Sequence, residues 1–219
     1  MSEKFLIILN WSEVWALLIP LFVLLFHRKQ PNFLRPVVLY LWLALLLNIS
    51  GDIIADFKLY FPAWLQSNTV LYNVHSVIRF TCFSSFFILL RQPYYKGVKK
   101  MLPFIFILFI TVNFSMGDNF FNPKHLSGNL LAAEAYLLLV YCMTYYLSEL
   151  KEEKVLTRGK DFWVVTGLSI YVVTNFFVFL FYVPMMTDNP DLASSMWNIH
   201  NVVYILLCLL IAKSLKVVL

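Results

Sequence analysis

The segment "LYNVHSVIRFTCFSSFFILL", residues 71–90, decides the fold class of this chain. About 20 apolar residues span the hydrocarbon core of a bilayer as a helix, and this segment has that length and is mostly apolar. Asn73, His75 and Arg79 nevertheless interrupt it. An arginine at the centre of a membrane helix costs at least ~2.5 kcal/mol, so such residues are rarely kept without a structural or functional role.

The composition of the whole chain agrees with a membrane protein. Of its 219 residues, 61% are hydrophobic and 13% are charged, whereas about 25% are charged in soluble domains. We attribute the net charge of +5 to basic cytoplasmic loops, and we expect the lipid bilayer and no nucleic acid as a partner. Cys82, Cys142 and Cys208 each fall within an apolar segment, so we expect no disulfides and no cysteine metal site.

Seven segments have the length and hydrophobicity of membrane spans. We therefore predict an all-α fold, with residues 1–219 forming a single bundle of seven transmembrane helices. The predicted spans are about 8–27, 35–57, 68–90, 100–117, 126–148, 162–185 and 194–214.

Lysine and arginine are distributed unequally between alternate loops. Thirteen of the 17 basic residues lie in one set of loops, and the other set holds only Lys4, Lys58 and Lys124. Cytoplasmic loops of membrane proteins carry the excess of Lys and Arg. The pattern therefore predicts an N-terminus outside and a C-terminus in the cytoplasm.

The polar residues within the spans gather in the outer half of the predicted bundle. A helix rises 1.5 Å per residue, so His75, Glu134 and Arg79 lie roughly 10, 12 and 16 Å below the outer edge. We expect an outward-facing polar pocket. Its candidate ligand-binding residues are Asp52, His75, Arg79, Glu134, Asn175, His200 and Asn201.

Helical phase supports a shared pocket. Tyr72, His75, Ser76 and Arg79 are spaced at i, i+3, i+4 and i+7, which places them on one face of a helix. The same spacing recurs in the last span, at Trp197, His200, Asn201 and Tyr204. Both stripes are expected to face the bundle interior, because polar side chains avoid lipid.

Two interpretations of Arg79 remain open. It could form a structural ion pair with Glu134, the first candidate, or with Asp52. It could also hold an anionic group on a ligand. Both can hold together, because a binding pocket can include a structural pair.

A metal site is an alternative interpretation of the same residues. His75, His200, Asp52 and Glu134 would give imidazole and carboxylate ligands of the kind that catalytic zinc uses. They lie on four helices, however, and none belongs to an HExxH motif. Asp52 and Glu134 could also act as an acid/base pair. We expect no enzymatic activity and no cofactor, and we keep a metal-dependent lipid hydrolase as the alternative.

Two known seven-helix architectures fit poorly. Bacterial rhodopsins need a Schiff-base lysine midway along the last helix, whereas Lys213 lies at its cytoplasmic end, so we expect no retinal. Alkaline ceramidase-like hydrolases bind zinc through three histidines, and only His75 and His200 lie within spans here.

One resemblance is closer. The segments "AEAYLLLVYCMTYYL" (133–147), "DFWVVTGLSIYVVTNFFVFLFY" (161–182) and "WNIHNVVYILLCLLIAKSL" (197–215) resemble an uncharacterised bacterial seven-transmembrane family. Its members are stand-alone proteins or membrane input modules near signalling proteins. The resemblance implies the same fold and a multi-pass location in the cytoplasmic (inner) membrane. At Arg79 that family is expected to carry an acidic residue, so this chain departs from it there.

We therefore expect a receptor-like or sensor-like membrane module. A small polar or anionic ligand, or a segment of a partner, would enter the outer pocket and shift the helices. The short loops and tail leave no room for an effector domain, so a cytoplasmic partner would carry the signal. A small-solute transporter is a further alternative, which the nearly apolar inner half of the spans disfavours.

Overall fold

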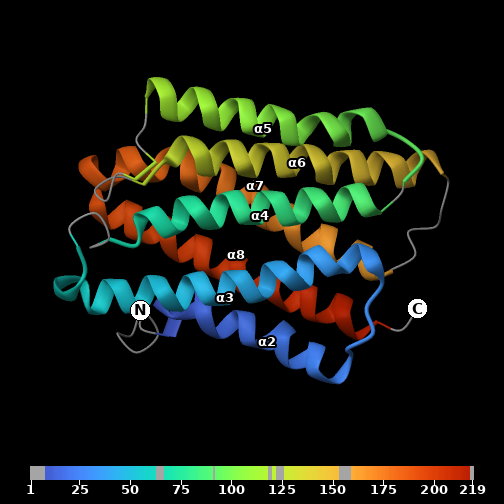
Figure 1. The fold of residues 1–219 in the computed structure, drawn as a ribbon, viewed down its shortest axis with the longest axis horizontal. Coiled ribbons are helices and arrows are strands. Elements are labelled where there is room, and N and C mark those ends of the chain that lie inside the picture. The colour runs from blue at the N-terminus through green and yellow to red at the C-terminus, as the bar shows by residue number, and fades with distance from the viewer. Residues whose placement is uncertain are drawn as a thin grey trace.

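The chain folds as a bundle of long helices (Figure 1). The structure, a computed structural model, describes residues 8–62, 67–90, 92–117, 120–121, 126–152 and 159–217. Its helices are Ser12–Phe26 (α2), Arg35–Asp56 (α3), Thr69–Leu89 (α4), Lys96–Met116 (α5), Gly128–Lys151 (α6), Lys160–Asp188 (α7) and Pro190–Lys216 (α8). Two short 3-10 helices, Asn32–Leu34 (η1) and Lys58–Tyr60 (η2), flank α3. The described residues contain no strand, which confirms the predicted all-α class.

Each predicted span coincides with one helix, but not every helix meets the criteria for a membrane span. Five segments are long and apolar enough: Asn32–Asp56, α5, α6, α7 and α8. The helix α2 is apolar but has only 15 residues. The helix α4 is long enough, but Asn73, His75 and Arg79 lower its hydropathy. The structure thus indicates a multi-pass membrane protein, and the count of seven spans and the orientation stay predictions.

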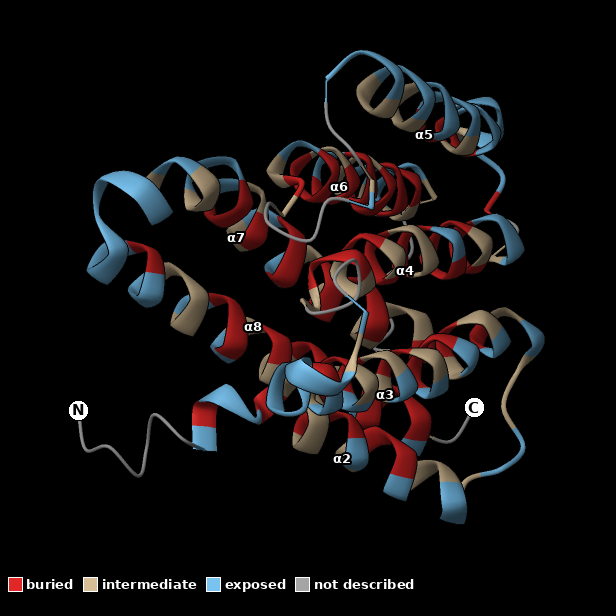
Figure 2. Ribbon diagram, turned by 60° about the vertical axis from the view of Figure 1, so that its left-hand side comes forward, coloured by how far each residue is buried: buried red, intermediate tan, exposed pale blue. Residues whose placement is uncertain are grey.

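Six of the helices form a closed ring, and α5 lies outside it. Going round the ring, α2 contacts α3, α3 contacts α4, α4 contacts α6, α6 contacts α7, α7 contacts α8, and α8 returns to α2. The helix α5 packs on α4 and α6 only at the periphery, and Figure 2 shows most of its surface exposed. A polar residue that faces inward from any ring helix can therefore meet residues of the other five.

The two ends of the bundle carry opposite charge. Successive helices run in opposite directions, so α2, α4, α6 and α8 begin at the same end (Figure 1). We call this the acidic end, because it carries Asp52, Asp56, Asp188 and Asp191. We call the opposite end the basic end. It carries a cleft of about 600 Å³ whose lining includes Arg28, Lys29, Lys160 and Lys216.

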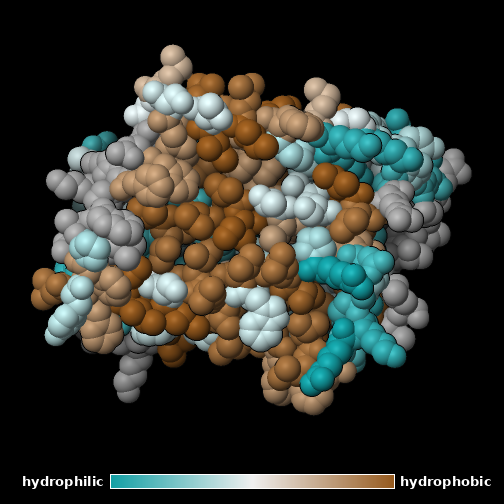
Figure 3. Space-filling view, in the orientation of Figure 1, coloured by the Kyte–Doolittle hydropathy of each residue, from teal (hydrophilic) through white to brown (hydrophobic). Residues whose placement is uncertain are grey.

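The ring has a dense aromatic core and an apolar outer surface. Phe87 stacks on Tyr141 with ring centres 5.0 Å apart, and both side chains are fully buried. On the outside, Phe104 is 73% exposed and Phe22 is 62% exposed. Figure 3 shows hydrophobic atoms across the middle of one face, with hydrophilic atoms gathered toward the basic end. Such a surface is stable in lipid, which solvates apolar side chains at no cost.

The helices α7 and α8 approach closely at Gly167. A Cβ atom on this buried glycine would lie 3.0 Å from the Cβ atom of Leu210. Gly167 therefore allows the two backbones to approach closely. At Gly97, by contrast, an added Cβ atom would meet no other atom within 4 Å.

We predict that Gly167→Leu lowers the midpoint of thermal unfolding in detergent, because the new side chain forces α7 and α8 apart. Overpacking costs about 1–3 kcal/mol, which corresponds to roughly 2–12 °C in a chain of this size. The matched control Gly97→Leu should change the midpoint little. Equal midpoints for the two variants would contradict the prediction.

Candidate functional site

The centre of the bundle is an ion pair between α4 and α6. Arg79 Nε lies 2.5 Å from Glu134 Oε1, and Arg79 Nη2 lies 2.7 Å from Glu134 Oε2. Both residues are at least 95% buried. Ser76 Oγ also donates a hydrogen bond to Glu134 Oε2, over 2.6 Å. The predicted pairing of Arg79 with Glu134 is therefore confirmed, and Asp52 is not its partner.

Two further side chains, one on α4 and one on α7, make hydrogen bonds to this ion pair. Ser76 and Arg79 lie three residues apart on α4, so they face the same carboxylate. On the other side, Arg79 Nη1 donates to the hydroxyl of Tyr171 on α7, over 2.6 Å. The guanidinium carbon also lies 5.1 Å from the centre of the Tyr171 ring. The arginine thus joins three helices.

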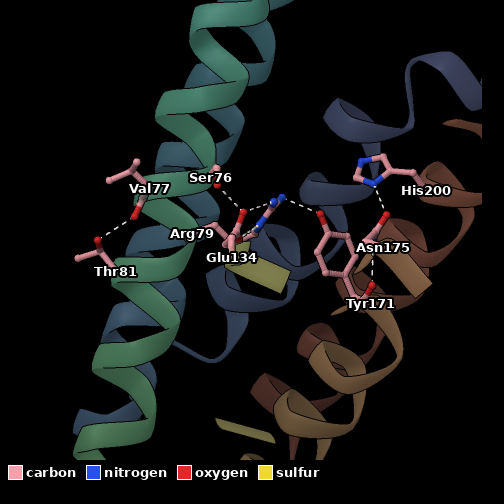
Figure 4. A network of polar contacts seen from close by, with 8 residues as sticks. All are labelled: Ser76, Val77, Arg79, Thr81, Glu134, Tyr171, Asn175 and His200. Carbon is pink, nitrogen blue, oxygen red and sulfur yellow. Dashed lines mark hydrogen bonds and ion pairs between the residues drawn. The ribbon is translucent and has the colours of Figure 1, made fainter. Parts of the chain in front are cut away.

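A chain of polar contacts continues from Tyr171 toward α8 (Figure 4). Asn175 Nδ2 donates to the backbone carbonyl of Tyr171 over 2.9 Å, which leaves its Oδ1 as an acceptor. His200 Nδ1 lies 2.7 Å from that Oδ1, so Nδ1 carries a proton and donates it. The orientation of the Asn175 amide therefore places a ring hydrogen of His200 on Nδ1.

The chain ends at Glu13 on α2, a residue that the sequence analysis missed. His200 Nε2 lies 3.1 Å from Glu13 Oε1, and the Tyr72 hydroxyl donates to Glu13 Oε2 over 3.1 Å. Asn48 on α3 donates to the backbone carbonyl of Glu13 over 2.7 Å. With Glu13 included, all six ring helices contribute to one network. The available signal was a carboxylate within the first predicted span, and the rule applied to Glu134 would have identified it.

The contact between His200 and Glu13 requires a proton. An ionised carboxylate only accepts hydrogen bonds, and a neutral imidazole whose Nδ1 holds the hydrogen has an acceptor at Nε2. Either His200 is the imidazolium or Glu13 is the carboxylic acid. In both cases the network as a whole is neutral, because Arg79 and Glu134 cancel.

Three predicted site residues lie beside the network and not in it. The Nε2 atom of His75 and both amide atoms of Asn201 are buried without a partner among the described residues. Asp52 is half-exposed. Two small cavities border this region, each of about 10 Å³, which is room for roughly one water molecule. Asp52 lines one of them, and His75 lines both.

The four residues of the metal hypothesis are not brought together. Nowhere in the described part of the chain do three or more His, Cys, Asp or Glu side chains lie close enough to hold a metal ion. Both oxygens of Glu134 are engaged by Arg79 and Ser76. The two ring nitrogens of His200 contact Asn175 and Glu13.

A cleft much larger than these two cavities opens at the acidic end, between the start of α4 and the α7–α8 turn. Its volume is about 590 Å³. The lining includes Asn68, Thr69, Tyr72, Tyr182, Thr187 and Trp197. Tyr72 and Trp197 also line the small cavity that reaches Arg79 and His200. The floor of the cleft therefore borders the buried network.

The fold and the site define a class: a multi-pass helical membrane protein with a buried polar network beneath an open cleft. Five long apolar helices support that class. No family model matches the chain, and no curated protein or solved structure matches it.

We predict that Arg79→Leu strongly destabilises the bundle, because it leaves Glu134 buried without a counter-charge. Breaking a buried pair costs about 3–5 kcal/mol, whereas replacing both partners by apolar residues is often nearly neutral. The double variant with Arg79→Leu and Glu134→Leu should therefore recover most of the stability in a denaturation experiment. A double variant as unstable as Arg79→Leu would contradict this account.

Proposed function

We propose that the chain is a receptor-like or sensor-like module of seven transmembrane helices, with its N-terminus outside and its C-terminus in the cytoplasm. A small ligand enters the cleft at the acidic end, and a partner at the basic end reads the resulting change in helix packing. One observation carries the proposal. The cleft of about 590 Å³ shares two wall residues, Tyr72 and Trp197, with the cavity that reaches the buried network.

The packing of α2 and α4 supports seven spans. The helix α4 contacts α3 and α6, and α2 contacts α3 and α8, and all three of these neighbours are apolar enough to cross a membrane. A helix held within a ring of membrane helices crosses the bilayer with them. The polar residues Ser76 and Arg79 of α4 are buried, so the neighbouring helices screen them from lipid.

The charge difference between the ends supports the orientation. The cleft at the basic end is lined by Arg28, Lys29, Lys160 and Lys216. Excess Lys and Arg at one side of a bundle is typical of the cytoplasmic side. The acidic end, with its cleft of about 590 Å³, then faces outward. The assignment to a bacterial inner membrane rests on the family resemblance.

The network gives a physical route from the cleft to the helices. A ligand that takes the hydrogen bond of the Tyr72 hydroxyl would release Glu13 Oε2, which accepts that bond here. Glu13 also contacts His200, and the chain continues through Asn175 and Tyr171 to Arg79. A ligand shifts a conformational equilibrium only by its different affinity for the two states. The exchange of this hydrogen bond supplies such a difference.

The occupied side chains favour binding over catalysis. A hydrolase needs a carboxylate or imidazole that is free to move a proton at a substrate atom. Glu134 and His200 are instead engaged on both sides by other side chains. Asp52 and His75 have polar side-chain atoms that no other described residue engages, but neither residue lines the cleft at the acidic end.

We predict that a membrane-impermeant maleimide labels Lys58→Cys on intact cells, but labels Lys29→Cys only after the membrane is opened. Both positions lie outside the predicted spans, at opposite ends of the bundle. The native cysteines are buried and should stay unlabelled. The reverse labelling pattern would invert the orientation, and labelling of both positions on intact cells would refute the seven-span topology.

We predict that filling the cleft changes hydrogen exchange at the basic end. A bulky maleimide adduct on Thr187→Cys, in the cleft lining, should alter amide exchange at the basic ends of α7 and α8. Adding Tyr171→Phe should suppress this distant effect, because it removes the hydroxyl that accepts from Arg79. The change next to the adduct should remain.

The matched control is an adduct on Lys58→Cys, at the same end but outside the cleft lining. It should leave the basic end unchanged. If the cleft adduct also leaves the basic end unchanged, the protein does not transmit a signal through this network.

A further inference from the structure

Three aromatic rings border the cleft. Tyr72 and Trp197 meet edge to face, with ring centres 5.5 Å apart and an interplanar angle of 88°. Tyr182 also contacts Trp197, with ring centres 5.1 Å apart and an interplanar angle of 41°. All three side chains are half-buried, so part of each faces the cleft. Ammonium groups are attracted to the faces of aromatic rings, and a site lined by several rings can recognise them.

The charge around the cleft selects the same kind of ligand. No lysine or arginine lies among the described lining residues. Deeper in the bundle, Arg79 is neutralised by Glu134 and is not available to an anion. Among the described residues outside the buried network, the acidic end carries four carboxylates and one lysine, Lys58. The carboxylates are Asp52, Asp56, Asp188 and Asp191.

A surface of one sign concentrates ligands of the opposite sign and repels those of its own sign. An anionic ligand, which Arg79 alone would suggest, is therefore disfavoured at this end. A cation is attracted both by the negative charge of this end and by the faces of the aromatic rings. The two observations are independent, because one rests on the ring geometry and the other on the distribution of charge.

Tyr72 links the aromatic wall to a carboxylate. Its hydroxyl donates to Glu13 Oε2, and Glu13 lines the small cavity below the cleft together with Tyr72 and Trp197. This hydrogen bond fixes the Tyr72 ring in the wall of the cleft. Glu13 also contacts His200, and the two form a neutral pair, so Glu13 adds no net charge beneath the rings. The side chain of Glu13 is 14% exposed, so it is not sealed off from the cavity.

We infer that the cleft at the acidic end binds a small organic cation whose ammonium group lies against Tyr72, Tyr182 and Trp197. This rests on the proposed function only in taking the cleft as the ligand site. The volume of about 590 Å³ is that of a small-molecule site. It is far larger than an ammonium group alone, so the ligand carries a further polar or apolar part.

The test compares two probes that differ only in charge. Choline and its neutral isostere, 3,3-dimethylbutan-1-ol, have the same shape, and each gives one sharp methyl signal. Saturation-transfer NMR on the full chain would measure both affinities. A maltoside detergent is needed, because phosphatidylcholine would itself present the ammonium group. We expect choline to bind at least tenfold more tightly than the isostere.

Variants identify the site. Trp197→Leu and Tyr182→Leu should each weaken choline about 2- to 30-fold, the range that corresponds to a cation–ring contact. Tyr182→Phe keeps the ring and should stay within about threefold of the parent chain. The control Tyr60→Leu removes an exposed ring at the same end, outside the cleft lining, and should have no effect.

The outcomes separate the two proposals. If the isostere or the anion 3,3-dimethylbutanoate, which carries the same methyl groups, binds as tightly as choline, and Trp197→Leu weakens that binding, the cleft is a ligand site but not a cation site. If choline, the isostere and this anion all give no signal with a chain that unfolds cooperatively, the cation inference and the ligand cleft both fail. Equal choline affinity in all folded aromatic variants would place the cation elsewhere and overturn the inference.

Discussion

The buried ion pair between Arg79 and Glu134 is the interaction on which the rest of the bundle depends. A guanidinium held away from water must be neutralised and must have its donors satisfied. Here Glu134 supplies both carboxylate oxygens and Tyr171 supplies a hydroxyl. These requirements fix how α4, α6 and α7 are placed along and rotated about their axes. A displacement of any one helix would leave a buried charge or hydrogen-bond donor without its partner. Apolar packing alone would tolerate such a displacement far better.

The same constraint explains the division between the ring and α5. Every ring helix contributes a polar group to the network, either a side chain or, in α2, a carboxylate and a backbone carbonyl. The helix α5 packs through contacts such as the stacked pair of Phe80 and Phe106. The Tyr141 hydroxyl also donates to the backbone carbonyl of Lys99 in α5, over 2.6 Å, outside the network. In the proposed sensor, the ring helices would move together and α5 would shield part of the ring from lipid.

Charge is organised at two scales. Inside the ring, Arg79 with Glu134 and His200 with Glu13 form two neutral pairs, the second of which holds one proton between an imidazole and a carboxylate. Outside, the acidic and basic ends differ in sign. The proposed outward cleft and the proposed cation ligand both follow from this arrangement. The internal charges are already paired, so the proposed ligand preference rests on the carboxylates at the surface of the acidic end.

The sequence by itself determined the helices, their approximate ends and the position of each polar residue along its helix, because hydropathy and a rise of 1.5 Å per residue act along the chain. Arg79 and Glu134 were expected in the same half of the bundle, which made Glu134 the first candidate partner. Position along a helix does not reveal which helices are neighbours or how far each is rotated about its own axis. Only the tertiary structure therefore placed α5 outside the ring and joined Glu13 to His200. It also left Asn201 beside the network and not in it, since contacts across a bundle depend on the packing of all its helices at once.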